Sequence, residues 1–282
     1  MRPLRFFLFI YIVAIVTANA GLATTDSLSL QSSVSEPDPQ IAINKDIENY
    51  LATIEQLEFQ GGIYSDNLSQ NLIQLGTLYQ HNDKHANAVK VFERALFLHR
   101  INDGLYSNNQ VAVIEKIINS LTRLKKWNLV NDRFSHLYWL ANKSLQHDHE
   151  KRLEITLKCA HWQLEAYNLR VAKIPMQSLV LGYKLFETAL RISSEEYGGA
   201  DLRLIEPLNG LLVSTYLAAT NKPFIDPRST PLRGYRNGIN LISLEIDILQ
   251  RQERLDHLRL TNAKLKLADW QLMYGKDQDA MT

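Results

Sequence analysis

Apolar residues recur at every third or fourth position over most of the chain from Ile41 onward, which places them on one face of an α-helix. The first such stretch ends at Gly61 and Gly62, because consecutive glycines disfavour helix and readily form left-handed caps. The same periodicity predicts further helices over residues 67–81, 85–100, 108–124, 128–146, 149–170, 177–196, 203–219, 237–253 and 255–274. No stretch alternates convincingly at the two-residue period of a β-strand. The pattern therefore predicts an all-α fold.

A repeat of 42 residues runs through the first part of the helical region. The tetrapeptide at 62–65, Gly-Ile-Tyr-Ser, recurs at 104–107 as Gly-Leu-Tyr-Ser. The same offset pairs Leu75 with Ile117, Tyr79 with Leu121, Ala88 with Val130 and Phe92 with Phe134. A period that holds through two helices and their connection is typical of stacked helical hairpins. We therefore expect two superposable hairpins in which Phe92 and Phe134 are buried at equivalent places.

Residues 69–100 carry the spacing of a known motif. Leu75, Gly76 and Tyr79 stand in its first helix, and Ala88, Phe92 and Ala95 stand in its second. This segment resembles a tetratricopeptide repeat, with Leu72 in place of the usual Trp and Arg100 in place of the usual Pro. The 42-residue period is similar to the kinesin-light-chain type of this repeat. The resemblance implies a tetratricopeptide-like α-solenoid of stacked antiparallel helix pairs over residues 41–219.

The later units depart from this motif. In the second unit Ile118 occupies the place of Gly76, so we expect its two helices to lie farther apart. The third unit keeps Gly182 in its second helix. In the fourth unit, Leu212 and Tyr216 repeat the pair formed by Leu75 and Tyr79.

The C-terminal helices, residues 239–282, resemble an incomplete repeat. An offset of 192 carries Leu75 onto Leu267 and Gly76 onto Ala268. The pattern then predicts that the chain stops inside a repeat, with Leu267 and Trp270 left uncovered. Either the gene product is truncated, or another element such as a second subunit covers this helix.

The N-terminus has the pattern of a secretory signal. Arg2 and Arg5 precede an apolar run over residues 6–16, and Ala18-Asn19-Ala20 forms a small-x-small cleavage site. We predict a signal peptide at 1–20, cleaved before Gly21, and a flexible linker at 21–40. The alternative, an uncleaved anchor, is disfavoured because the run is shorter than the ~20 residues that span a bilayer. The protein is then exported: periplasmic in a Gram-negative bacterium, otherwise secreted.

Composition gives little support to catalysis or nucleic-acid binding. The formal net charge is +1, so no strong field favours nucleic acid. The single cysteine, Cys159, excludes an internal disulfide and reads as a buried apolar residue. Two histidine clusters, His81 with His85 and the 147–150 segment, lie where helices are predicted to meet and lack spaced additional ligands. Trp127, Trp139, Trp162 and Trp270 fall at helical spacing among Leu and Ile, which favours packing. We expect no enzyme activity, metal or cofactor.

The expected function is binding of another protein or peptide, with no nucleic acid and no membrane span after cleavage. By the resemblance, the concave groove of the solenoid is lined by the first helix of each hairpin. The groove residues would be Gln70, Ile73, Thr77 and Gln80 in the first unit and Ala112, Glu115, Asn119 and Thr122 in the second. Two rivals are an accessory subunit of an envelope enzyme complex and a small-molecule binder. The Pro-rich loop at 220–238 is either a further partner contact, a structural plug or disorder. The oligomeric state is not determined by the sequence.

Overall fold

A computed structural model describes residues 39–62, 64–220, 234–276 and 279. The predicted signal peptide, nearly all of the linker and most of the 220–238 loop lie outside the described residues. Within the described part, all regular secondary structure is helical. None of the described helices is both long and apolar enough to cross a membrane.

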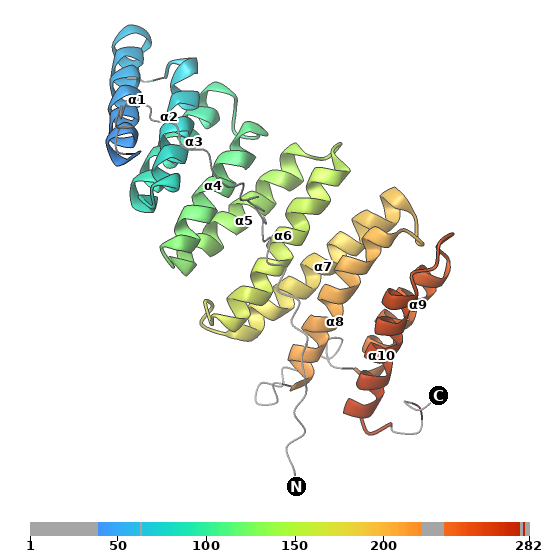
Figure 1. Cartoon of the computed structure of the whole chain (residues 1–282). Helices are drawn as coiled ribbons and strands as arrows, with labels where there is room; N and C mark the ends of the chain where they lie inside the picture. Colours follow the sequence, from blue (N-terminus) through green and yellow to red (C-terminus); the bar gives the residue numbers. More distant parts are fainter. Residues whose placement is uncertain (1–38, 63, 221–233, 277–278, 280–282) are drawn as a thin grey trace, which may run out of the picture. The chain divides into compact units, whose positions relative to one another are not determined.

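The described residues form ten α-helices, which follow one another in a series (Figure 1). They are α1 (Pro39–Gly61), α2 (Asp66–His81), α3 (His85–Asn102), α4 (Asn109–Arg123), α5 (Trp127–Ser144), α6 (His149–Asn168), α7 (Pro175–Tyr197), α8 (Ile205–Thr220), α9 (Tyr235–Gln250) and α10 (His257–Met273). A 3₁₀ turn, η1 (Leu202–Leu204), precedes α8. Each helix packs against the next, and α2 also contacts α4 as α6 contacts α8. This is the serial packing of an α-solenoid, in which each unit contacts its neighbours. The all-α prediction is confirmed, and every helix lies within a few residues of its predicted bounds.

The turns inside the α2–α3, α4–α5 and α6–α7 hairpins share one geometry. Asp83, Lys125 and Arg170 have φ of 54°, 55° and 54°, although none of them is glycine. In the first of these turns the Asp83 N–H donates to the Gln80 carbonyl, and the next N–H donates to the Tyr79 carbonyl at 2.9 Å. The same pair of bonds recurs in the α4–α5 and α6–α7 turns. These bonds satisfy the free carbonyls at the helix end and offset the strain of the left-handed residue.

The turn between hairpins also repeats. Gly62 and Gly104 have φ of 76° and 95°, a region where glycine has no Cβ clash. Ser65 donates its N–H to the Gly62 carbonyl and Ser107 to the Gly104 carbonyl, each at 3.2 Å. The 42-residue offset read from the sequence is therefore an offset in backbone conformation as well.

The first hairpin closes around one aromatic ring. A Cβ atom built on Gly76 would lie 2.4 Å from Phe92 Cε1, so only glycine admits the fully buried Phe92 ring here. In the second hairpin Ile118 fills that space, and α4 and α5 make less extensive contact than α2 and α3. Phe134 is accordingly only half-buried. The expectation of equivalent burial was wrong in degree, because Ile118 occupies the space in which the Phe134 ring would pack.

In the fourth unit, the predicted register was wrong. Leu212 and Tyr216 are half-buried, and the buried side of α8 is formed by other residues. These are Leu211, Ser214, Thr215 and Ala218. Their spacing matches the buried residues 114, 117, 118 and 121 of α4. The prediction assumed that polar residues of α8 would face solvent. Ser214 and Thr215 can instead be buried, because their hydroxyls donate to the Gly210 and Leu211 carbonyls, both at 2.8 Å.

Trp270 of α10 corrects a further expectation. It is buried, because its ring packs directly on Gly238 of α9 and its Nε1 donates to the Tyr235 carbonyl at 3.0 Å. Leu267, by contrast, is only half-buried. The expectation that both residues are left uncovered was therefore wrong for Trp270.

Candidate partner-binding groove

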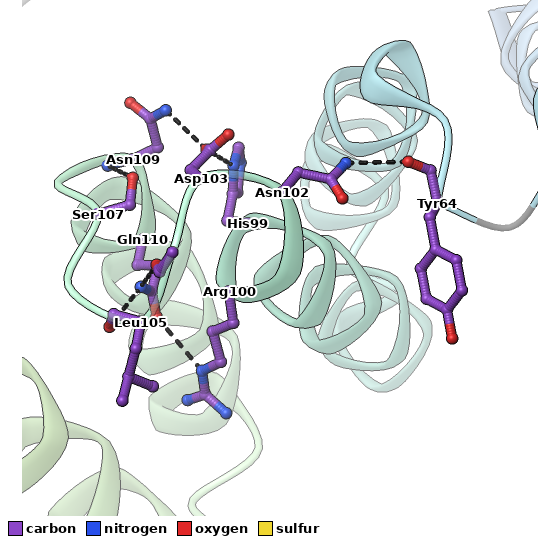
Figure 2. Close-up of polar contacts among 10 residues, drawn as sticks. Tyr64, His99, Arg100, Asn102, Asp103, Leu105, Ser107, Asn109 and Gln110 are labelled. Carbon is purple, nitrogen blue, oxygen red and sulfur yellow. Dashed lines mark hydrogen bonds and ion pairs between the residues drawn. The ribbon is translucent and has the colours of Figure 1, made fainter.

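The position of α4 is set by a polar network at the α3–α4 connection (Figure 2). Gln110 is fully buried and donates its amide to the Gly104 and Leu105 carbonyls at 3.1 and 2.9 Å. Arg100 of α3 donates to the Gln110 side-chain carbonyl at 3.3 Å. These bonds tie the first turn of α4 to the preceding helix and so orient the remaining residues of α4.

The Arg100 guanidinium also donates to His136 of α5, 3.3 Å from Nε2. Burial is the first cause that lowers the pKa of His136, to about 4, and the charges of Arg100 and Arg133 add to it. The imidazole is therefore neutral near pH 7, and one of its nitrogens can accept the Arg100 hydrogen bond.

An open groove of about 800 Å³ lies between α4 and α6. Its walls and floor are formed by Glu115, Ile118, Asn119, Thr122 and Arg123 of α4, Phe134 and Leu137 of α5, Glu154, Leu157, Lys158, His161, Trp162 and Glu165 of α6, and Glu206 of α8. The floor is apolar and the rim is polar and charged. This arrangement is typical of sites that bury an apolar anchor and orient it with a few polar contacts.

Lys158 links the two walls of the groove. Its ammonium lies 2.5 Å from a Glu115 carboxylate oxygen and 2.7 Å from one of Glu154. Burial alone would lower the Lys158 pKa, but hydrogen bonds to the two carboxylates outweigh it and raise the pKa. Lys158 is thus a fixed cation shared by α4 and α6, and it holds the wall residues in one arrangement.

The floor of the groove is aromatic. The Phe134 ring stacks on Trp162, with centroids 5.2 Å apart and planes 11° from parallel. Trp162 Nε1 donates to the Asn131 side-chain carbonyl at 3.1 Å, so the buried indole is satisfied. The half-buried Phe134 is therefore an apolar surface held in place from below.

Cys159 lies beneath this floor. It is buried, and burial raises the pKa of its thiol to about 12. The thiolate that a nucleophile requires is not formed near neutral pH. The prediction that Cys159 is a buried apolar residue is confirmed.

The sequence-predicted groove residues fall into two groups. Glu115, Asn119 and Thr122 of the second unit line the groove between α4 and α6. In the first unit, Thr77 and Gln80 contact α4 instead. Gln80 donates to the Lys116 carbonyl and to Ser120 Oγ, both at 2.8 Å, and Lys116 donates to Thr77 at 3.1 Å.

The remaining predicted positions lie outside the groove between α4 and α6. Ile73 is half-buried against the core, and Gln70 and Ala112 are exposed. A partner-binding role for any of the predicted residues stays a prediction.

Sequence reasoning missed the α6 wall and the floor. The third unit has extra residues after α6, so the 42-residue offset could not be carried onto Lys158, His161 or Glu165. The left-handed residue Arg170 is the feature that aligns α6 with the earlier units, and it is visible only in the backbone.

The other chemistry considered in the sequence is dispersed. His85 lies 3.6 Å from Asp83, and His149 lies 3.7 Å from Glu196. Among the residues described, no three His, Cys, Asp or Glu side chains gather as metal ligands would. Trp162 and Trp270 are buried and Trp127 is half-buried, but Trp139 is exposed, against Tyr106 at 5.5 Å between ring centroids.

Comparison with solved structures identifies related folds. BtubC (BKLC) from P. vanneervenii matches with a TM-score of 0.51 and 13% identity, over 85% of this chain and 87% of that one. A putative kinesin light chain with nearly identical TPR-like repeats from Podosopora anserina matches with a TM-score of 0.50 and 14% identity, over 75% of this chain and 89% of that one. No family model matches the sequence, and no curated protein matches it. The likeness is therefore one of fold.

Proposed function

We propose that this chain, a tetratricopeptide-like repeat protein by its fold, is an exported, non-enzymatic scaffold that binds another protein in the groove between α4 and α6. The observation that carries the proposal is the groove itself. It has an aromatic floor and a charged rim, and it lies between α4 and α6, each the first helix of its hairpin. Repeat folds of this kind bind extended segments or helices across successive units.

The groove favours a partly apolar segment of the partner. An apolar side chain resting on Phe134 would be removed from water, with a gain of about 25 cal/mol for each Å² buried. Asn119 and Thr122 lie beside this floor and offer both hydrogen-bond donors and acceptors. Because Lys158 already holds Glu115 and Glu154, little ordering of these side chains remains to oppose binding.

The test is capture of the partner by the mature chain, residues 21–282, from extract of the source cells. Replacing both Asn119 and Thr122 with Arg would fill the groove without disturbing its buried floor. Capture of the partner should fall at least tenfold, while the melting temperature stays nearly unchanged. The matched control is Gln146→Arg, an exposed position outside the groove, which should capture as well as the wild type. Equal capture by the double variant would remove the proposed function from this groove.

Export has its own test. The basic residues, apolar run and small-x-small site at the N-terminus support cleavage after Ala20. Mass spectrometry of the exported protein should therefore find Gly21 at the N-terminus. A chain that retains Met1 in the membrane fraction would contradict cleavage and leave the groove proposal unaffected.

A further inference from the structure

The helix α10 has the backbone signature of a first helix of a hairpin. Gly275 has φ of 70°, its N–H donates to the Leu272 carbonyl at 3.0 Å, and the Lys276 N–H donates to Gln271 at 2.9 Å. These are the bonds that Asp83 and its successor make at the end of α2, shifted by 192 residues. The offset suggested by the sequence for Leu267 is thus the structural register of α10.

One face of α10 is apolar and exposed. Leu258, Leu265 and Leu272 follow a seven-residue spacing and are 71%, 58% and 47% exposed. In α2, the positions that correspond to Leu265 and Leu272 are Ile73 and Gln80. Gln80 binds the Lys116 carbonyl and Ser120 of α4, so this is the face on which a neighbouring first helix lies. Among the described helices, α10 packs on α9 and reaches α8 through Lys266, whose ammonium donates to Asn209 Oδ1 at 2.7 Å.

The helix α1 has the backbone signature of the second helix of a hairpin. It leads into the Gly62 turn as α3 leads into the Gly104 turn, and so it is a second helix in this register. Its Tyr50 stands at the place of Phe92, and it is half-buried where Phe92 is fully buried. Among the described helices, α1 packs on α2 and is also joined to α3 by the ion pair between Glu58 and Arg94.

We propose that the exposed face of α10 binds a second copy of this chain head to tail, with α1 of the second copy completing the hairpin begun by α10. The α2 helix of the second copy then lies against α10 as α4 lies against α2. Carried over from that contact, Leu272 meets Leu78 of the second copy and Asp269 meets Gln74 of the second copy. Ala268 lies opposite Tyr50 of the second copy, as Gly76 lies opposite Phe92.

Several charges of the two helices are already paired within the chain. In α1, Glu58 pairs with Arg94 of α3. In α10, Lys266 pairs with Glu245 of α9 at 2.8 Å and Arg259 pairs with Asp256 at 3.3 Å. The repeat register rather than charge therefore identifies the occupant, because α10 ends as a first helix and α1 ends as a second helix, and a contact between these unlike surfaces continues the series. Such a contact is heterologous, so it leaves one free surface of each kind on every dimer.

Sedimentation velocity of the mature chain over a concentration series tests the proposal. The wild type should associate beyond a dimer as concentration rises. Leu272→Asp should block only the α10 surface, and Leu78→Asp only the α1–α2 surface, so each variant alone should remain monomeric. An equimolar mixture should form a dimer and nothing larger, because each variant keeps the surface that the other lacks. Leu181→Asp, at an exposed leucine of α7, is the matched control and should associate like the wild type.

Circular dichroism melting of each variant keeps the test independent of folding. If Leu78→Asp unfolds, Gln74→Asp replaces it, because it would place a second carboxylate opposite Asp269. A wild type that stays monomeric throughout the series would overturn the proposal. Association of either single variant with itself, or failure of the mixture to dimerise, would do the same. None of these results bears on partner capture by the groove, so the two proposals fail separately.

Discussion

Substituting Gly76 with alanine tests the packing of the first hairpin, because local and tertiary effects have opposite signs there. Alanine is favoured over glycine inside a helix by about 1 kcal/mol. At this position, however, the new methyl group would lie 2.4 Å from Phe92 Cε1, 2.7 Å from Cδ1 and 2.8 Å from Cζ. Phe92 has no exposed surface, so its ring cannot move aside without disturbing the surrounding core.

The steric clash with Phe92 should outweigh the gain in helix propensity. Overpacking a well-filled core costs ~1–3 kcal/mol, which outweighs the gain in helix propensity. We expect Gly76→Ala to lower the free energy of unfolding by about 1 kcal/mol and the melting temperature by a few degrees, roughly 2–4 °C. Urea unfolding followed by far-ultraviolet circular dichroism measures the first, and faster amide exchange in α2 and α3 locates the effect.

Two further variants separate the clash from other effects of the methyl group. In a Phe92→Leu background the ring is gone, so adding Gly76→Ala should cost nothing or should stabilise. Gly182→Ala is the matched control, because its methyl would meet Gln163 Cβ at 3.2 Å, which a small shift relieves. If Gly76→Ala stabilises the protein while Phe92 is present, the close approach of α2 and α3 described above is incorrect.

Three other predictions follow from the packing and the shifted pKa values. His136 binds a proton less readily when folded than when unfolded, so the free energy of unfolding should decrease as pH falls from about 6.5 toward 4. For this half-buried group the loss is on the order of 1 kcal/mol, and His136→Gln should flatten the decrease in pH-dependent urea titrations. The Cys159 thiol, with its pKa raised to about 12, should react with Ellman's reagent at pH 8 only as fast as the protein unfolds, and rapid labelling of the native chain would contradict its burial. Gly238→Ala, which would place a methyl 2.0 Å from the Trp270 ring, should speed amide exchange in α9 and α10 and leave α2 and α3 unchanged.

The fold could be predicted from the sequence to a large extent because it is built from local signals. Helix periodicity, glycines at turns and a constant offset between units all depend on residues close together in the chain. The Leu75 and Phe92 pattern was sufficient to place the first hairpin. Where the pattern can be satisfied in two ways, as at Leu212 and Tyr216, the prediction failed. Buried hydroxyls of Ser214 and Thr215 look polar in the sequence but are satisfied by their own helix.

The candidate groove was predicted only in part. Glu115, Asn119 and Thr122 could be placed from the repeat register, since they lie within the second unit. Lys158 and Phe134 could not, because one depends on the alignment of α6 across extra residues and the other on the volume of Ile118. Side-chain volume decides how far two helices approach, and that distance is not encoded by spacing along the chain.

The sequence by itself determined the all-helical class, the bounds of the helices and the 42-residue repeat, because helix formation and turn chemistry act over a few residues. Only the tertiary structure decided which positions face a neighbouring helix and which face solvent. Gln80, read as a groove residue, is bonded to α4, and Trp270, read as uncovered, packs on Gly238. In the same way, the sequence does not distinguish the exposed leucines of α10 from the buried leucines of the core. Their exposure depends on which helices pack against α10, and that is a property of the assembled units rather than of any one segment.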